Sequence, residues 1–131
     1  MQNSLDQFTN HSYLNLKTYR KNGEEVASPL WFVQEGKTIL VRTISGSGKV
    51  KRVHNNPNVE IMPCGSNGEP LGDWVPALAR ELDDARTYNK VADLLSAKYG
   101  KEPKEYEIKA IARGERYIVL EIKLKKRKTG D

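Results

Sequence analysis

A run of short β-strand patterns, each ended by a tight-turn signal, constrains the fold of this chain more than any other feature. Residues 11–19 alternate between the two faces of a strand, and Asn22-Gly23, a strong hairpin signal, follows them. Further strands are predicted in chain order at residues 25–34, 37–44, 58–64, 72–82 and 115–125. Sequential short strands with tight turns are typical of an antiparallel barrel or sandwich, so we expect a mainly β domain with six strands.

The second predicted strand, residues 25–34, carries apolar side chains on both of its faces. Such a strand has to be covered on both sides, so we expect something besides the core to contact it. Pro29 lies inside this strand and cannot donate a hydrogen bond to a neighbouring strand. The strand is therefore bulged or has an unpaired edge there, and a planar ligand could use that interruption.

The pattern changes to a helical period after the fifth strand. Apolar residues recur at helical spacing in residues 83–99, with Asp83 or Asp84 as the N-cap and Gly100 just past the end. This pattern predicts the main helix of the domain. Residues 101–113 fit either a short helix or a strand.

The segment between the third and fourth strands has the form of an anion site. Small residues fill positions 45–48, and a short basic helix is predicted from about Lys49 to residue 55. The unpaired N–H groups at the start of such a helix attract a phosphate. A turn with solvated lysines fits the same residues equally well. A nucleotide-binding P-loop does not, because Thr43 and Val50 occupy positions where it needs glycine and Ser or Thr.

Length and composition indicate one domain with polar ends. The chain has 131 residues, and we expect a polar segment at 1–10, a folded domain at 11–125 and a basic tail at 126–131. Neither a signal peptide nor a membrane-spanning run is recognisable, and the single cysteine, Cys64, fits a reducing compartment, so a cytoplasmic protein is expected. The net charge of +5 suits phosphate-bearing ligands as well as nucleic acid.

The sequence contains no self-sufficient catalytic constellation. His11 and His54 have no metal-ligating neighbours at metal-site spacing, so no metal site is expected. Asp83 and Asp84 lie at a helix start, where carboxylates usually act as caps. Cys64 is expected to be a buried structural thiol. If the protein is an enzyme, its reactive group should belong to a bound cofactor.

Several ordered sequence blocks resemble a known family. The blocks read VASPLWFV, ILVRT, SGKVKRV, NNPNV and PCGSNGEPLGDWVPALARE, and they cover residues 13–82. Together they resemble the pyridoxamine 5′-phosphate oxidase-like split-barrel flavoproteins, and most closely their branch of deazaflavin (coenzyme F-420) dependent oxidoreductases. The resemblance implies a six-stranded antiparallel split β-barrel of the FMN-binding type. It also implies a homodimer with two cofactors at the subunit interface.

The resemblance assigns cofactor contacts to positions of this chain. The cofactor ring would lie against the second strand and the end of the third, and the phosphate would bind at Lys49. A longer deazaflavin tail would extend along Lys51 and Arg52, while Trp74 would reach the cofactor of the other subunit. The complete set of expected contacts is Ser28, Pro29, Leu30, Trp31, Arg42, Thr43, Ser47, Gly48, Lys49, Arg52 and Trp74.

The chain also departs from the oxidases of this family. Those enzymes carry arginine at the positions of Ser28 and Gly48, and they close their substrate site with a C-terminal Trp and Arg segment, which this chain lacks. Pyridoxine phosphate oxidase activity is therefore not expected. We expect an oxidoreductase that transfers a hydride between FMN or coenzyme F-420 and a small organic substrate.

A second hypothesis is a binding or carrier protein of the same fold that holds a flavin, deazaflavin or haem without turnover. Nucleic acid is an unlikely partner, because the basic residues are not interleaved with aromatic residues that could stack on bases.

Overall fold

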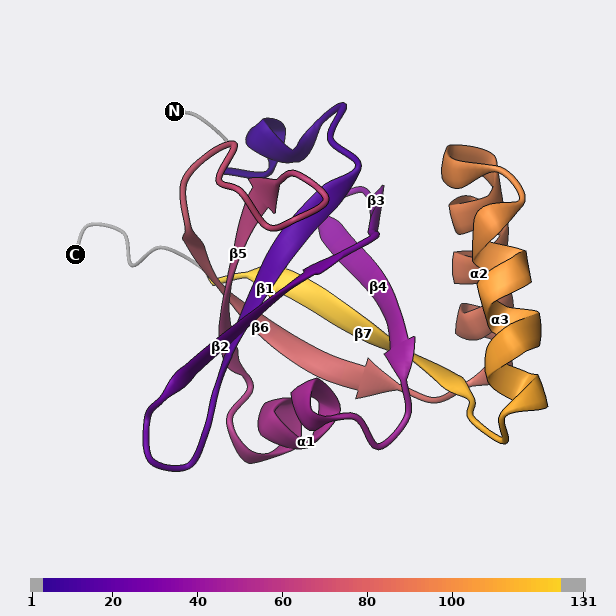
Figure 1. Ribbon diagram of the computed structural model, residues 1–131. Helices are drawn as coiled ribbons and strands as arrows, with labels where there is room; N and C mark the ends of the chain where they lie inside the picture. The colour runs from indigo at the N-terminus through magenta and orange to yellow at the C-terminus, as the bar shows by residue number, and fades with distance from the viewer. Residues whose placement is uncertain (1–3, 126–131) are drawn as a thin grey trace.

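A computed structural model describes residues 4–125, and an antiparallel sheet of seven strands forms its centre (Figure 1). The expected basic tail at 126–131 lies outside the described residues. The strands are β1 (Tyr13–Tyr19), β2 (Glu25–Leu30), β3 (Val33–Glu35), β4 (Thr38–Ile44), β5 (Asn58–Cys64), β6 (Val75–Leu82) and β7 (Tyr117–Leu124). The helices are η1 (Ser4–Phe8), α1 (Gly48–Asn55), α2 (Ala85–Tyr99) and α3 (Glu102–Ala112).

The sheet is curled but open, which confirms the predicted split barrel. Its strand order is β2-β1-β5-β6-β7-β4-β3, and every neighbouring pair is antiparallel. The two edge strands, β2 and β3, follow each other in the chain and are separated only by Trp31 and Phe32. The barrel is therefore split where these two residues cross between the sheet's edges.

The prediction of one strand over residues 25–34 was wrong, and the division into β2 and β3 raises the strand count from six to seven. Phe32 turns into the core, where it is 1% exposed and packs edge-to-face on Phe8 at 6.0 Å between ring centroids. Its main-chain N–H and C=O both lie within hydrogen-bond distance of the Tyr99 hydroxyl. These contacts take the place of strand pairing and stop the ladder.

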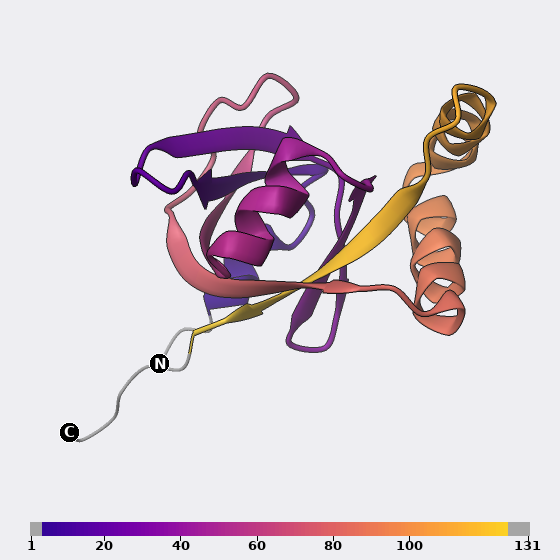
Figure 2. The same ribbon diagram turned by 90° about the horizontal axis from the view of Figure 1, so that it is seen from below.

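The barrel interior is closed by short helical segments at its openings. Val50 and Val53 of α1 are buried in the main core, and Figure 2 shows α1 lying across the barrel. Leu5 and Phe8 of η1 are buried in the same core. Residues 4–8 thus form a packed helical turn within the expected polar N-terminal segment.

Helices α2 and α3 form an arm at one side of the barrel (Figures 1 and 2). α2 packs Val91 and Leu95 in a second core cluster together with buried residues of β3, β4 and β7. Its predicted caps are confirmed: Asp84 accepts a hydrogen bond from the N–H of Thr87, and Gly100 ends the helix with a φ of 78°. The ambiguous segment 101–113 forms α3.

Candidate functional site

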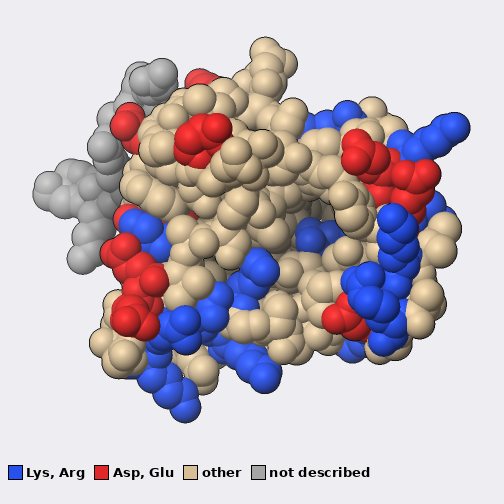
Figure 3. Space-filling model, viewed as in Figure 1, with Lys and Arg blue, Asp and Glu red and all other residues tan. Residues whose placement is uncertain are grey.

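A cavity of about 320 Å³ opens at the split between the sheet edges. It is lined by Tyr13, Pro29, Leu30, Trp31, Arg42, Thr43, Ile44, Tyr106 and Tyr117. The lining includes five of the six residues expected to contact a cofactor ring from the second and third predicted strands, and the sixth, Ser28, does not line the cavity. Figure 3 shows the surface hollowed between the barrel and the helical arm.

The helical arm fixes one wall of this cavity. Trp31 stacks on Tyr99 at 4.9 Å between ring centroids and meets Tyr106 edge-on at 5.5 Å. The Tyr99 hydroxyl also donates to the carbonyl of Ser12 at 2.8 Å. Sequence reasoning missed Tyr106 and Tyr117, because neither residue belongs to a recognisable motif. Only the packing of α3 and β7 beside the split brings them to the cavity.

Arg42 is held by the arm. Its Nη2 donates to the carbonyl of Pro103 at 2.7 Å, and its Nη1 lies 3.9 Å from Glu107. The guanidinium also lies over the Tyr117 ring, at 4.4 Å from the ring centroid. Arg42 therefore lines the cavity, but its positive charge already interacts with Glu107 and the Tyr117 ring. Its contacts with Pro103 and Glu107 connect β4 to α3.

The loop expected to bind an anion has an unsatisfied group at the start of α1. Ser47 is the N-cap residue, but its side chain makes no capping hydrogen bond. Its Oγ is buried and has no hydrogen-bond partner within the described residues. An unsatisfied buried polar atom costs about 1–3 kcal/mol. A ligand that bonds this hydroxyl would recover that energy.

Two cations, Lys49 and Arg52, belong to the helix that Ser47 caps. Lys49 makes no ion pair or hydrogen bond with any residue from 4 to 125, and burial, together with the charge of Arg52, lowers the pKa of its ammonium. Burial and the charge of Arg20 lower the pKa of Arg52. Lys51 is exposed, as expected for a residue on a different face of the helix. Lys49, Arg52 and Arg20 are thus close enough for their charges to interact. Arg20 pairs with Glu24, whereas Lys49 and Arg52 form no ion pair with a carboxylate within residues 4–125.

Strand β2 links the cation cluster to the cavity. Near its start, the carbonyl of Val26 accepts a hydrogen bond from Thr18, whose Oγ1 accepts a second one from Nε of Arg52. At its end, Leu30 borders the cavity. Four residues of strand span about 13 Å. Ser28 lies between these two points, with its side chain on the same face of β2 as those of Val26 and Leu30. One strand therefore extends from the residues expected to bind the phosphate to those expected to bind the ring.

Trp74 lies on the other face of the sheet. Its ring is 4.0 Å from the ammonium of Lys17, which also forms an ion pair with Glu60 at 3.1 Å. Lys17 and Thr18 are adjacent in β1, so their side chains point to opposite faces. Thr18 contacts Arg52 of the cation cluster. Trp74 is therefore separated from this chain's own cluster by the sheet.

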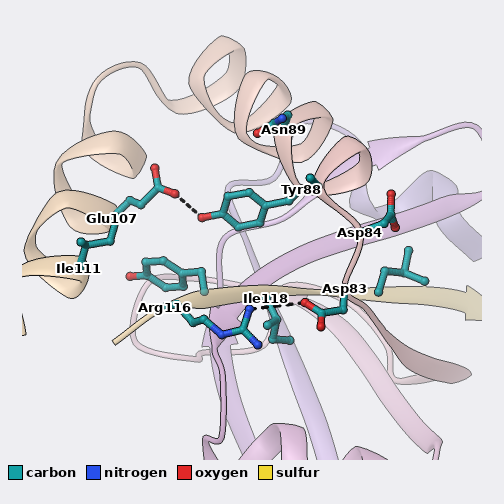
Figure 4. Close-up of a pocket in the computed structure, with 11 residues that line it drawn as sticks. Asp83, Asp84, Tyr88, Asn89, Glu107, Ile111, Arg116 and Ile118 are labelled. Carbon is teal, nitrogen blue, oxygen red and sulfur yellow. Dashed lines mark hydrogen bonds and ion pairs between the residues drawn. The ribbon is translucent and has the colours of Figure 1, made fainter. Parts of the chain in front are cut away.

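A second cavity, of about 360 Å³, lies between the arm and the start of β7 (Figure 4). Its acidic side chains already have partners within the structure. The hydroxyl of Tyr88 donates to Glu107, and Asp83 lies 3.5 Å from Arg116. None of the predicted cofactor contacts lines this cavity. It shares only Tyr117 with the cavity at the split.

The lining of the cavity at the split limits the chemistry that side chains can supply there. Among the residues that the structure describes, it includes no His, Cys, Asp or Glu. Cys64 is 2% exposed at the end of β5, as predicted for a structural thiol, and burial raises its pKa. No group of three potential metal ligands occurs between residues 4 and 125. Over the same range, no helix is long and apolar enough to cross a membrane.

Solved structures with this fold are similar in shape and distant in sequence. HutZ, the haem storage protein from Vibrio cholerae, has a TM-score of 0.70 and 16% identity, covering 93% of this chain and 87% of that one. General stress protein 26 from Bacillus anthracis has a TM-score of 0.64 and 20% identity, covering 91% and 84%. An F-420 reductase has a TM-score of 0.57 and 13% identity, covering 96% of each chain. At such identities the likeness shows the fold alone.

Sequence comparison identifies the family. No curated protein matches the chain significantly. A family model described as pyridoxamine 5′-phosphate oxidase matches residues 1–129, almost the whole chain. This match agrees with the open antiparallel sheet and with the residues gathered at its split. The chain therefore belongs to the pyridoxamine 5′-phosphate oxidase family.

Proposed function

We propose that the protein is an oxidoreductase that uses bound FMN or coenzyme F-420 and acts on a small organic substrate. The observation that carries the proposal is that β2 extends from the neighbourhood of Arg52 and Lys49, which have no carboxylate partner, to a partly aromatic cavity. FMN likewise consists of a planar ring joined by a chain to a phosphate, so its ring would suit the cavity and its phosphate would suit the cations. Membership in the pyridoxamine 5′-phosphate oxidase family supports this reading.

The residues take separate roles in binding. Pro29, Leu30 and Trp31 hold the ring from one side of the cavity, and Thr43 borders it at the end of β4. Lys49 binds the phosphate together with the Ser47 hydroxyl and the free N–H groups of the first turn of α1. The cofactor supplies the hydride chemistry when bound. No side chain is assigned as a general acid.

The active form is proposed to be a cytoplasmic homodimer. Alternate residues of the edge strand β2 are exposed in the single chain, although the strand is largely apolar. If a second copy of the chain covered this face, β2 would be covered on both sides, as its apolar residues on both faces require. It would also bring its Trp74 toward the cofactor site of this chain, which Trp74 of the same chain does not reach.

Binding without turnover is the second candidate. It is favoured by one observation: the cavity at the split has no His, Cys, Asp or Glu among its described lining residues. A carrier needs only affinity for its ligand, whereas many reductions also need a proton donor. In the enzymatic case the proton would have to come from a tyrosine of the lining, the substrate, the solvent or the partner subunit.

A spectroscopic experiment tests the proposal. The purified protein is incubated with FMN or with coenzyme F-420, freed of unbound ligand by gel filtration, and examined by visible spectroscopy. We expect a retained cofactor spectrum, and protein that stays colourless with both ligands would contradict cofactor binding. Retained cofactor is then reduced and exposed to candidate acceptors. Oxidation by an organic acceptor, faster than oxidation of free reduced cofactor, supports an enzyme; the free rate with every acceptor supports a carrier.

A further inference from the structure

Arg42 carries the only full charge among the described residues that line the cavity at the split. The other residues of this lining are apolar, aromatic or, in one case, a threonine. The Arg42 side chain is itself only 6% exposed. Water and salt screen a buried charge much less than a surface charge. The electrostatic potential inside the cavity therefore depends mainly on Arg42 and on the group that neutralises it.

Glu107 of α3 is the carboxylate that neutralises Arg42. Its Oε1 lies 3.9 Å from Nη1 of Arg42, and its side chain is 13% exposed. Between residues 4 and 125, no other carboxylate lies within ion-pair distance of Arg42. Glu107 does not line the cavity at the split but the second cavity, beside the arm (Figure 4). It therefore offsets the charge of Arg42 from outside the cavity that Arg42 lines.

Two neighbours hold the Glu107 carboxylate in place. The Tyr88 hydroxyl of α2 donates to Oε2, as Figure 4 shows, while Oε1 is the oxygen nearest to Arg42. Nζ of Lys104 lies 3.6 Å from the same Oε1, but the Lys104 side chain is 70% exposed and its charge is well screened. Helices α2 and α3 thus together fix a negative charge beside Arg42.

The remaining contacts of Arg42 orient it without neutralising it. Nη2 donates to the carbonyl of Pro103 at 2.7 Å, and the Tyr117 ring lies 4.4 Å from the guanidinium carbon. A carbonyl and a ring carry no net charge. Without Glu107 the cavity would face a buried cation that lacks a counter-ion, which is an unfavourable arrangement unless a bound anion compensates it.

We propose that Glu107 is a positioning residue that, through Arg42, sets how readily a ring bound in the cavity at the split accepts a hydride. The inference rests on the proposed function and deepens it. A hydride brings two electrons and one proton, so its transfer from a substrate adds one unit of negative charge to the ring. A nearby cation stabilises the ring more after this gain than before it. By pairing with Arg42, Glu107 weakens that stabilisation and keeps the reduced cofactor a stronger hydride donor.

The test compares wild type, Glu107→Gln, Arg42→Gln and the double variant. Glutamine at 107 removes the charge but keeps an oxygen that can accept the Tyr88 hydrogen bond. Each protein is checked for folding by circular dichroism and thermal melting, and is loaded with FMN, or with coenzyme F-420 if only that is retained. Its midpoint potential is then measured by reductive titration against a reference dye. Glu105→Gln, which removes an exposed carboxylate from the same helix, is the matched control.

The expected shifts have opposite signs for the two partners. Glu107→Gln should raise the midpoint potential, with the preference for reduced over oxidised cofactor rising roughly tenfold, or about 30 mV for a two-electron couple. Arg42→Gln should lower the potential. With Arg42 already replaced, Glu107→Gln should have a much smaller effect. Glu107→Asp, which keeps the charge but draws it back from Arg42, should give a smaller rise, and Glu105→Gln should match wild type.

Four results would overturn the inference. One is an unchanged potential in Glu107→Gln, and another is an equal shift in Glu105→Gln. Equal shifts with and without Arg42 would show that Glu107 does not act through Arg42. If Glu107→Gln does not fold, Glu107→Asp decides, and a wild-type potential in that variant counts against the proposal. Retained cofactor with any of these results refutes only the inference, whereas wild type that retains neither FMN nor F-420 refutes the proposed function as well.

Discussion

The main-chain N–H of Phe32 donates a hydrogen bond to the hydroxyl of Tyr99 at 3.0 Å, although the two residues are 67 positions apart. The same hydroxyl lies 2.8 Å from the carbonyl oxygen of Phe32. The last turn of α2 therefore holds the two-residue crossing where the barrel is split. Since Trp31 precedes Phe32 and stacks on the Tyr99 ring, this contact also sets the wall of the cavity.

Replacing Tyr99 with phenylalanine should therefore destabilise the fold. The change keeps the ring that supports Trp31 but leaves the N–H of Phe32 without its partner. We expect a loss of about 1–3 kcal/mol in the free energy of unfolding, measured by urea denaturation. Tyr106→Phe is the matched control, because the Tyr106 hydroxyl bonds no residue in the described range. Equal stability of Tyr99→Phe and wild type would show that the hydroxyl does not secure the crossing.

Lys49 should be the largest single contributor to phosphate affinity. Lys49→Ala removes an ammonium group that has no other partner in residues 4–125, so the expected effect is on ligand binding and not on folding. We expect FMN affinity to fall roughly 10- to 100-fold by fluorescence titration, with riboflavin affinity unchanged. An FMN affinity that stays at the wild-type value would remove Lys49 from the site.

The Tyr88–Glu107 contact should give the stability a dependence on alkaline pH. Burial, reinforced by the hydrogen bond to Glu107, raises the pKa of Tyr88 to about 12 from its ordinary 10.0. Its stabilising contribution is therefore complete below pH 10 and is lost as pH rises toward 12. Urea denaturation should show wild type more stable than Tyr88→Phe by a constant amount below pH 10 and by a shrinking amount above it. A difference that stays constant up to pH 12 would contradict this shift.

The exposed face of β2 should be a dimer contact. Ala27 pairs with Lys17 in the sheet and lies on the same face as Trp74. Ala27→Glu should therefore convert a dimer to a monomer in sedimentation velocity, and weaken FMN retention if the partner's Trp74 completes the site. Lys37→Glu, in the exposed turn between β3 and β4, is the control. A wild-type protein that sediments as a monomer of 14.8 kDa would refute the dimer.

Much of the fold could be predicted because its signals are local. Asn22-Gly23 marks the first hairpin, and Asp84 and Gly100 mark the ends of α2, since turn and cap preferences depend on a few neighbouring residues. The break at residues 31–32 could not be predicted. The apolar run at residues 29–33 looks like the continuation of one strand until a partner from elsewhere, here Tyr99, takes up the backbone groups of Phe32.

Part of the candidate site could also be predicted from the sequence, and part could not. Its loop and basic helix were recognisable from small residues followed by Lys49, and the family resemblance placed the ring contacts on β2. Tyr106 and Tyr117 were not recognisable, because they reach the cavity only through the packing of α3 and β7. The guanidinium of Arg52 lies beside Gly48, where an added Cβ atom would be 2.7 Å from Nη1, and this placement depends on the direction of one long side chain. Sequence spacing shows that residues share a helix face, but not which space a side chain fills.

A crystal structure of the protein grown with FMN is the most direct test of the central claim that one ligand spans the cavity at the split and the start of α1. The ring is predicted to lie against Pro29, Leu30 and Trp31. The phosphate should accept hydrogen bonds from Lys49 and Ser47. FMN bound in the cavity of Figure 4, or with its phosphate away from α1, would contradict the account.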